Sequence, residues 1–163
     1  MGISIRKSTN NDLAKIYDLS AICFGSVACK KVINSSLKDR YLLLFDDDNL
    51  VAMTGLYTKS EFKALEIDWT CTDPKYRNKC YMHMLFDELL KNIKEPVYCS
   101  ALKLSDFADT NLHKVLTDFN FVKVIPTRVT YTVPHNCFRF SVEECVYYKE
   151  PNCTCSEDLY LRS

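Results

Sequence analysis

The sequence predicts a mixed α/β domain with a largely antiparallel central sheet flanked by helices. Strand-like and helix-like stretches alternate along the chain. The strand-like stretches alternate apolar and polar residues or are short apolar runs, whereas in the helix-like ones apolar residues recur every three or four positions. Three strand-like stretches follow one another between residues 41 and 72 with short polar connections, which favours antiparallel pairing. The chain has 163 residues, of which 47% are hydrophobic, and this suffices for one packed core.

The first elements are a strand and two helices. Residues 3–6 alternate apolar and polar side chains, which predicts a short strand. Thr9 and Asp12 have the spacing of a capping box, so a helix is expected to follow them and to run to about Cys23. Residues 28–38 indicate a second helix. The apolar positions of the first helix lie at three- and four-residue steps: Leu13, Ile16, Leu19 and Cys23.

Three strands are expected next. The continuous apolar run at residues 41–45 predicts a buried strand. Residues 46–49, three aspartates and an asparagine, are typical of a turn. Residues 50–58 and 62–72 then predict two further strands joined by a short polar loop.

The second half begins with an amphipathic helix after Pro74, which is expected to stop before Pro96. Its apolar positions are Met82, Leu85, Phe86, Leu89, Leu90 and Ile93. A strand at residues 97–102 and a helix at 106–118 follow, the helix with Leu112, Val115 and Leu116 directed inward. Two strands, 121–133 and 143–149, complete the order β-α-α-β-β-β-α-β-α-β-β. We expect one domain over residues 1–150 and an irregular, cysteine-containing C-terminal extension over 151–163.

Charge and hydropathy exclude some function classes. The 21 basic and 21 acidic residues give zero formal net charge, which argues against a nucleic-acid partner. No apolar stretch approaches the length of a membrane span, so no membrane partner is expected. The first seven residues lack the apolar core of a secretory signal. We therefore expect a cytoplasmic protein.

The nine cysteines are odd in number and are interpreted as reduced thiols that serve mainly as small apolar side chains. Cys153 and Cys155, with Cys137 and Cys145 upstream, do not have the paired spacing of a zinc site. No metal is expected.

Residues 66–82 carry the chemistry: a strand end, a proline turn, a basic loop and a helix start. A helix N-terminus presents unpaired N–H groups and a partial positive charge. Arg77 and Lys79 add positive charge, so the segment suits a pyrophosphate. The alternative is an ordinary strand-to-helix connection with solvated charges.

This segment resembles the coenzyme A loop of the GNAT N-acetyltransferase superfamily, Arg/Gln-x-x-Gly-x-Gly/Ala, often preceded by Pro-x-Tyr. Residues 74–82 (Pro-Lys-Tyr-Arg-Asn-Lys-Cys-Tyr-Met) fit that frame, with Cys80 and Met82 in place of small residues. A backbone N–H is still present at each position, and Cys and Met can adopt helical angles. The resemblance implies acetyl-CoA as co-substrate. It also implies a set of coenzyme-binding residues: Cys71, Thr72, Arg77, Asn78, Lys79, Cys80, Tyr81 and Met82.

A second stretch, residues 109–121, resembles a later helix of the same family, which often ends in Gly-Phe; here the ending is Asn120-Phe121. The predicted element order from residue 3 to about 149 also follows the family. A tyrosine on that helix often protonates the leaving thiolate, and Leu116 occupies its position. His113 and Tyr131 could substitute, but neither matches by position and neither is assigned.

Glu66 is the candidate catalytic base. It lies eleven residues before Arg77, a spacing at which some family members carry a catalytic glutamate on the same strand. A carboxylate can take the proton from an amine that attacks a thioester, directly or through water. Asp68 shares its face by strand period and is the reserve base. In the alternative interpretation Glu66 is a solvated or salt-bridged strand residue.

The leading functional hypothesis is an acetyl-CoA-dependent N-acetyltransferase, in which an amine of a small molecule or peptide attacks directly in a ternary complex. The main alternative is a catalytically weak or inactive GNAT-fold module that binds an acyl-CoA or a protein, which Cys80, Met82 and Leu116 favour. A cysteine-rich metal or redox protein ranks last. No motif identifies the amine, and either a monomer or a homodimer is expected.

Overall fold

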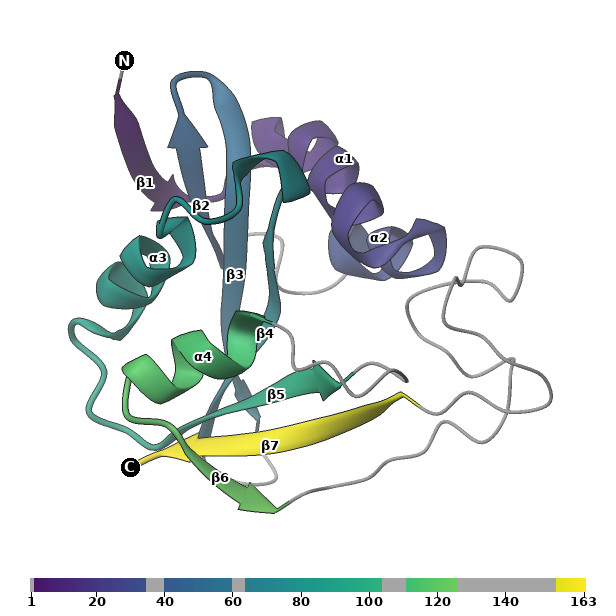
Figure 1. Ribbon diagram of the computed structural model, residues 1–163. Helices are drawn as coiled ribbons and strands as arrows, with labels where there is room; N and C mark the ends of the chain where they lie inside the picture. Colours follow the sequence, from purple (N-terminus) through teal and green to yellow (C-terminus); the bar gives the residue numbers. More distant parts are fainter. Residues whose placement is uncertain (1, 35–39, 60–63, 104–110, 126–154) are drawn as a thin grey trace, which may run out of the picture.

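In a computed structural model of the chain, the structure describes residues 2–34, 40–59, 64–103, 111–125 and 155–163 (Figure 1). These residues form a seven-stranded sheet of order β1-β2-β3-β4-β5-β7-β6. The strands are β1 (Ile3–Lys7), β2 (Tyr41–Asp46), β3 (Asn49–Lys59), β4 (Ala64–Thr72), β5 (Val97–Lys103), β6 (Val122–Ile125) and β7 (Ser156–Arg162). The helices are α1 (Leu13–Phe24), α2 (Ser26–Asn34), α3 (Tyr81–Leu90) and α4 (Asn111–Asp118), with 3₁₀ turns at Asn10–Asp12 and Pro74–Tyr76.

The predicted fold class is confirmed, and the described helices and strands follow the predicted order as far as β6. One assignment is wrong: residues 156–162 were expected to be irregular, but they form β7, which pairs with both β5 and β6. The sequence of β7 does not show the pattern of a strand, because the side that is buried carries the acidic Asp158 as well as Tyr160. The strand expected at residues 143–149 and most of that at 121–133 lie outside the described residues.

The sheet is antiparallel except between β4 and β5, which the α3 crossover makes parallel. These two strands pair only at Leu65–Val97, Glu66–Tyr98 and Ile67–Cys99. β4 nevertheless continues to Thr72 and β5 to Lys103. Figure 1 shows the two strands diverging beyond the paired positions, so the sheet parts in its middle.

Helices cover both faces of the sheet. α1 and α2 pack over β2 and β3 through a core that includes Ile16, Val32, Leu43 and Met53. On the opposite face α3 packs against β2 and β3 through Leu44 and Leu85. Together with α4 it also packs against β4, β5 and β7, in a core that contains Ile67. Because side chains alternate along a strand, Glu66 points to the α1 and α2 face. Figure 1 shows the α1–α2 pair and the α3–α4 pair on opposite sides of the strands.

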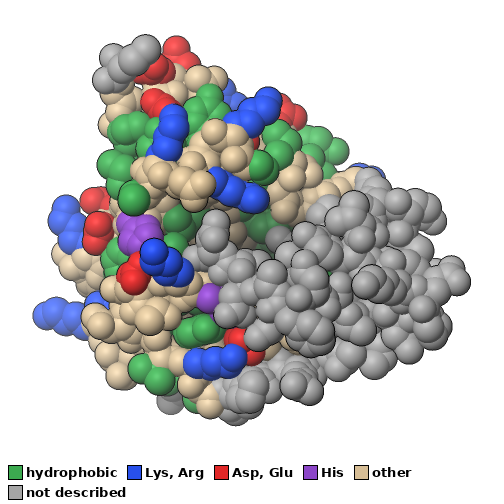
Figure 2. All heavy atoms as spheres, in the orientation of Figure 1, with side chains coloured by type: hydrophobic (Ala, Val, Ile, Leu, Met, Phe, Trp, Pro, Cys, Tyr) green, Lys and Arg blue, Asp and Glu red, His purple; other side chains and the backbone are tan. Residues whose placement is uncertain are grey.

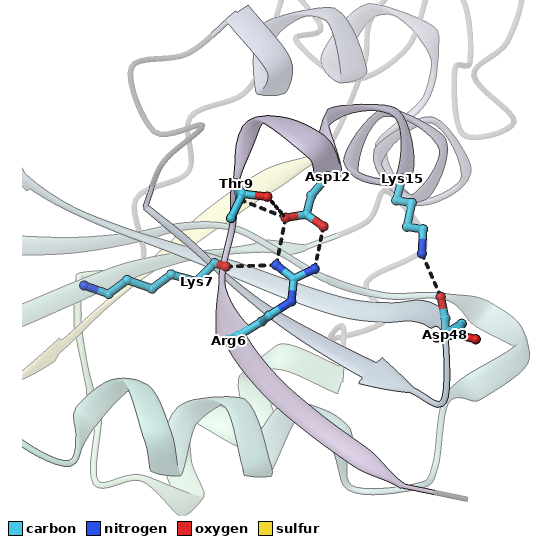
Figure 3. Close-up of polar contacts among 6 residues, drawn as sticks. All are labelled: Arg6, Lys7, Thr9, Asp12, Lys15 and Asp48. Atoms are coloured by element: carbon cyan, nitrogen blue, oxygen red, sulfur yellow. Dashed lines mark hydrogen bonds and ion pairs between the residues drawn. The ribbon is translucent and has the colours of Figure 1, made fainter.

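The predicted capping box is present at the start of α1 (Figure 3). The Thr9 backbone N–H and hydroxyl both donate to Asp12 Oδ2, at 2.8 and 2.7 Å. Arg6 donates from its two terminal nitrogens to the two oxygens of the same buried carboxylate, at 2.8 and 2.6 Å. These hydrogen bonds, that of Arg6 foremost, hold the pKa of Asp12 well below its usual range. The Arg6 guanidinium also lies 4.6 Å from the centroid of the Phe45 ring.

Outside the grey atoms, the face drawn in Figure 2 intersperses basic side chains with acidic ones rather than gathering them in one block. Within the described residues, no helix is long and apolar enough to cross a membrane.

Candidate active site

A β-bulge interrupts β4 close to the point where β4 and β5 separate. Thr54 of β3 faces two residues of β4, Trp69 and Thr70, because the register with β3 shifts by one residue there. The pairs on either side of the shift are Met53–Cys71 and Gly55–Asp68. The hydroxyls of Thr54 and Thr70 lie 2.8 Å apart and span the bulge. An inserted residue of this kind bends a strand, so the bulge accounts for the divergence of β4 from β5.

Trp69 adopts a left-handed backbone conformation at the bulge, with φ of 52°. Such an angle is costly for a bulky residue and persists only where its surroundings fix it. Two contacts do so here. The Trp69 N–H donates to Asp68 Oδ1 at 2.7 Å, and the indole ring packs edge-on against Phe24 of α1, with centroids 5.6 Å apart.

The loop after β4 begins with a capped turn. Asp73 accepts a hydrogen bond from the Lys75 N–H at 2.9 Å and so starts the 3₁₀ turn Pro74–Tyr76. Arg77 is extended, whereas Asn78 and Cys80 have positive φ values of 64° and 58°. Cys80 therefore does not adopt the right-handed helical angles that cysteine can take. The chain reverses direction into α3 at Cys80 and needs there the left-handed conformation that glycine adopts most easily.

This loop is basic, exposed and anchored to β2. Residues 77–80 are all exposed, immediately before the first turn of α3. Lys79 Nζ lies 3.8 Å from Asp46 Oδ2 and over the rings of Tyr76 and Tyr81, at 5.1 and 5.7 Å from their centroids. Tyr81, the buried first residue of α3, donates its hydroxyl to Asp46 Oδ2 at 2.6 Å. That hydrogen bond, with burial, raises the pKa of Tyr81 to about 12, so the hydroxyl remains a donor.

The residues present fit an anionic group such as the pyrophosphate of coenzyme A. The N-terminal turn of α3 offers backbone N–H groups and the positive end of the helix dipole. The loop adds the exposed Arg77 and Lys79. The other predicted coenzyme residues differ in role. Cys71 is buried in the core under α1 and α2, and Thr72 is half-buried with its carbonyl 3.5 Å from Cys23 Sγ. Met82 belongs to the first turn of α3 and packs, partly buried, against the cores between that helix and the sheet.

Glu66 and Asp68, the predicted base and its reserve, lie on the same face of β4. Glu66 belongs to the last-but-one pair with β5, and Asp68 lies just beyond the final pair. Two tyrosines from neighbouring strands, which the sequence did not point to, donate their hydroxyls to Glu66 Oε2: Tyr57 of β3 and, at 2.7 Å, Tyr98 of β5. Burial and the hydrogen bond to Glu66 raise the pKa of Tyr57.

The α4 positions considered for the general acid are buried. Leu116 is fully enclosed in the core. His113 faces the sheet, with Nδ1 2.9 Å from Tyr160 Oη and Nε2 3.3 Å from the Leu102 carbonyl. Tyr131 lies outside the described residues. The structure therefore assigns no general acid to α4.

The cysteines of the described segments are free thiols: Cys23, Cys29, Cys71, Cys80, Cys99 and Cys155. In these segments no three His, Cys, Asp or Glu side chains gather as a metal site would require. Burial raises the pKa of Cys99, which lies at the last position where β5 pairs with β4. Cys137, Cys145 and Cys153 lie outside the described residues.

The mixed sheet parts beside a basic loop at a helix N-terminus. This arrangement is that of a class of proteins that can bind a long anionic ligand. Solved structures share this fold. A GNAT-family acetyltransferase from Bacillus cereus is 13% identical with a TM-score of 0.69, over 100% of this chain and 98% of that one. A GNAT-family acetyltransferase from Elizabethkingia anophelis with acetyl-CoA bound is 17% identical with a TM-score of 0.69, over 99% and 97%.

Diaminobutyrate acetyltransferase from Paenibacillus lautus, solved with L-2,4-diaminobutyric acid and coenzyme A, is 9% identical with a TM-score of 0.66, over 98% and 93% of the two chains. Among curated protein sequences none matches. The model of the acetyltransferase (GNAT) domain matches residues 4–102, more than half of the chain. The chain therefore belongs to the GNAT acetyltransferase family, as its loop and element order had indicated.

Proposed function

We propose that the protein is an acetyl-CoA-dependent N-acetyltransferase in which an amine attacks the thioester directly, within a ternary complex. One observation carries the proposal: a single strand, β4, ends in the basic loop at the start of α3 and bears the Glu66 carboxylate beside its separation from β5. The acetyl-CoA in the Elizabethkingia structure, and the diamine and coenzyme A in the Paenibacillus one, support this pairing of substrates.

In this mechanism the loop from Arg77 to Met82 binds the pyrophosphate through backbone N–H groups and positive charge. The pantetheine arm enters between β4 and β5, where backbone groups past Ile67 and Cys99 have left the strand ladder. The acceptor approaches from the α1 and α2 face. Its nitrogen forms a bond to the acetyl carbon, the carbon–sulfur bond breaks, and coenzyme A leaves as a thiolate that solvent protonates. Glu66 takes the proton from nitrogen, directly or through water, and Asp68 is the reserve.

The acceptor is an amine of a small molecule or of a peptide. The second candidate function is an acyl-CoA-binding or protein-binding module with little turnover, which the buried Leu116 at the usual position of the acid favours. Cys80 no longer supports that candidate strongly, because its left-handed conformation preserves the turn that glycine would make.

Coenzyme binding is the first testable prediction. Acetyl-CoA binds only the folded chain and should therefore raise the melting temperature. Replacing Arg77 and Lys79 by alanine should weaken affinity at least about tenfold, since two charge-assisted contacts to phosphate are lost. Native mass spectrometry and calorimetry measure binding, and Lys91→Ala at the far end of α3 is the control. The proposal would be contradicted if millimolar acetyl-CoA produced no heat of binding and no shift in the melting temperature.

Glu66→Gln is the second prediction. Glutamine keeps the shape of the side chain but cannot accept the proton, so kcat should fall by roughly 10²–10⁴ while coenzyme affinity stays nearly unchanged. The loss should shrink as pH rises, because more of the amine is then already neutral. Glu88→Gln, at an exposed position of α3, is the matched control. Full turnover by Glu66→Gln at neutral pH would mean that Asp68 or water accepts the proton instead. No turnover of any amine by the parent would favour the binding module.

A further inference from the structure

We propose that Tyr57 and Tyr98 are positioning residues for Glu66, and that their two hydroxyls hold its carboxylate in one orientation at the β4–β5 separation. This inference rests on the proposed role of Glu66 as proton acceptor. It adds two groups to the site that come from strands on either side of β4.

Strand register brings the three side chains together. Tyr57 of β3 is the antiparallel partner of Glu66, and Tyr98 of β5 is its parallel partner. Paired residues project to the same face of a sheet, so a tyrosine flanks the carboxylate on each side. Both hydroxyls converge on one oxygen, Oε2, the Tyr98 hydroxyl at 2.7 Å. The carboxylate is thereby connected to both neighbouring strands.

The chemistry of the donors makes these contacts strong. O–H···O⁻ hydrogen bonds to a carboxylate are among the strongest in proteins. Tyr57 is half-buried and Tyr98 is buried, so water competes weakly for these bonds. Burial and the hydrogen bond to Glu66 raise the pKa of Tyr57, so its hydroxyl stays protonated and remains a donor.

The two bonds also reduce the rotameric freedom of Glu66. A glutamate on a strand has three rotatable bonds, and ordering them during the reaction would cost entropy. The tyrosine pair orders them beforehand, one residue before the point where β4 and β5 cease to pair. A base fixed at that place meets the requirement that a catalytic group be held close to its productive geometry.

The test uses Tyr57→Phe, Tyr98→Phe and the double variant, which keep both rings and remove only the hydroxyls. We expect each single change to lower kcat by about tenfold at neutral pH, given the usual strength of a hydrogen bond to a charged group. The KM for acetyl-CoA should be unchanged, because the loss is confined to the orientation of the base. Tyr41→Phe removes another buried hydroxyl, bonded to the Val32 carbonyl at 3.0 Å, and should leave kcat unchanged.

The same substitutions in the Glu66→Gln background separate the two proposals. If the tyrosines act through Glu66, their removal there should have no further effect on kcat. An equal loss in that background, or single variants with parental kcat, would overturn the positioning role while leaving Glu66 as base. Full activity of Glu66→Gln itself would overturn the role of Glu66 and this inference with it.

A measurement independent of turnover completes the test. The infrared spectrum should contain a carboxylate stretching band that disappears in Glu66→Gln. The frequency of this band should shift in Tyr57→Phe and Tyr98→Phe but not in Tyr41→Phe, since only the first two variants lose a hydrogen bond donated to Glu66. An unchanged frequency in both variants would refute the inference even if no acceptor amine had been found.

Discussion

Cys80 shows how one residue can depart from a family pattern and still preserve its geometry. Its φ of 58° lies in the region where a Cβ costs roughly 1–2 kcal/mol. The loop sustains this cost because the next residue, Tyr81, is buried and bonded to Asp46. The sequence correctly predicted a turn and a helix start at this place. It could not predict the backbone angle, since cysteine has no preference for positive φ.

Cys80→Gly should therefore raise the free energy of unfolding by about 1 kcal/mol, because glycine adopts this angle without steric cost. Coenzyme affinity should be maintained or increased, since backbone can approach phosphate more closely. Urea denaturation and calorimetry measure the two quantities. Asn78→Gly is the comparison, with a smaller expected gain because asparagine tolerates φ of 64° better. Weaker coenzyme binding in Cys80→Gly would show that the loop binds in another way.

At the scale of elements, the bulge in β4 depends on its neighbour β3. Gly55 pairs with Asp68 just below the bulge, and a Cβ there would lie 3.2 Å from the Asp68 carbonyl oxygen and 3.1 Å from the Tyr41 ring. Neither can yield easily: the carbonyl belongs to the backbone, and Tyr41 is fully buried. β3 must therefore carry glycine at this position for the two strands to approach.

Gly55→Ala should destabilise the protein by about 1–3 kcal/mol through overpacking, and should lower kcat because the bulge beside Glu66 would shift. Chemical denaturation and steady-state kinetics measure the two effects. The matched control is Gly2→Ala, where an added Cβ meets nothing within 4 Å. An unchanged midpoint of denaturation would mean that β3 and β4 can separate there without cost.

Periodicity predicted the elements more successfully than their partners. The apolar spacing of α3 and the three strands before it was sufficient to place them. β7 was missed, because its sequence mixes charged residues with Leu159, Tyr160 and Leu161 and is buried only through pairing with β5 and β6. Tyr57 and Tyr98 were missed for a related reason. Their meeting at Glu66 depends on strand register, and nothing in their local sequence encodes it.

At the scale of the whole molecule, the N-terminal ion pair ties the first strand to the first helix and makes stability depend on acidity. Asp12 is 4% exposed and accepts hydrogen bonds from Arg6 of β1 and from Thr9 (Figure 3). In the unfolded chain the same carboxyl would titrate near its ordinary pKa of about 4. A group with a lowered folded-state pKa stabilises the fold above the unfolded value, and that contribution is lost as pH falls toward the folded value.

Asp12→Asn should consequently lower the free energy of unfolding at pH 7 by about 2 kcal/mol, the usual scale for hydrogen bonds to a buried charged group. Below about pH 4 the parent chain itself loses the contribution, so the difference between parent and variant should narrow there. Urea denaturation at stepped pH measures this. Glu88→Gln removes an exposed pair with Lys91 and should show little effect at any pH. A difference between Asp12→Asn and the parent that stays constant down to pH 2 would mean that Asp12 stabilises α1 by its shape and not through its charge.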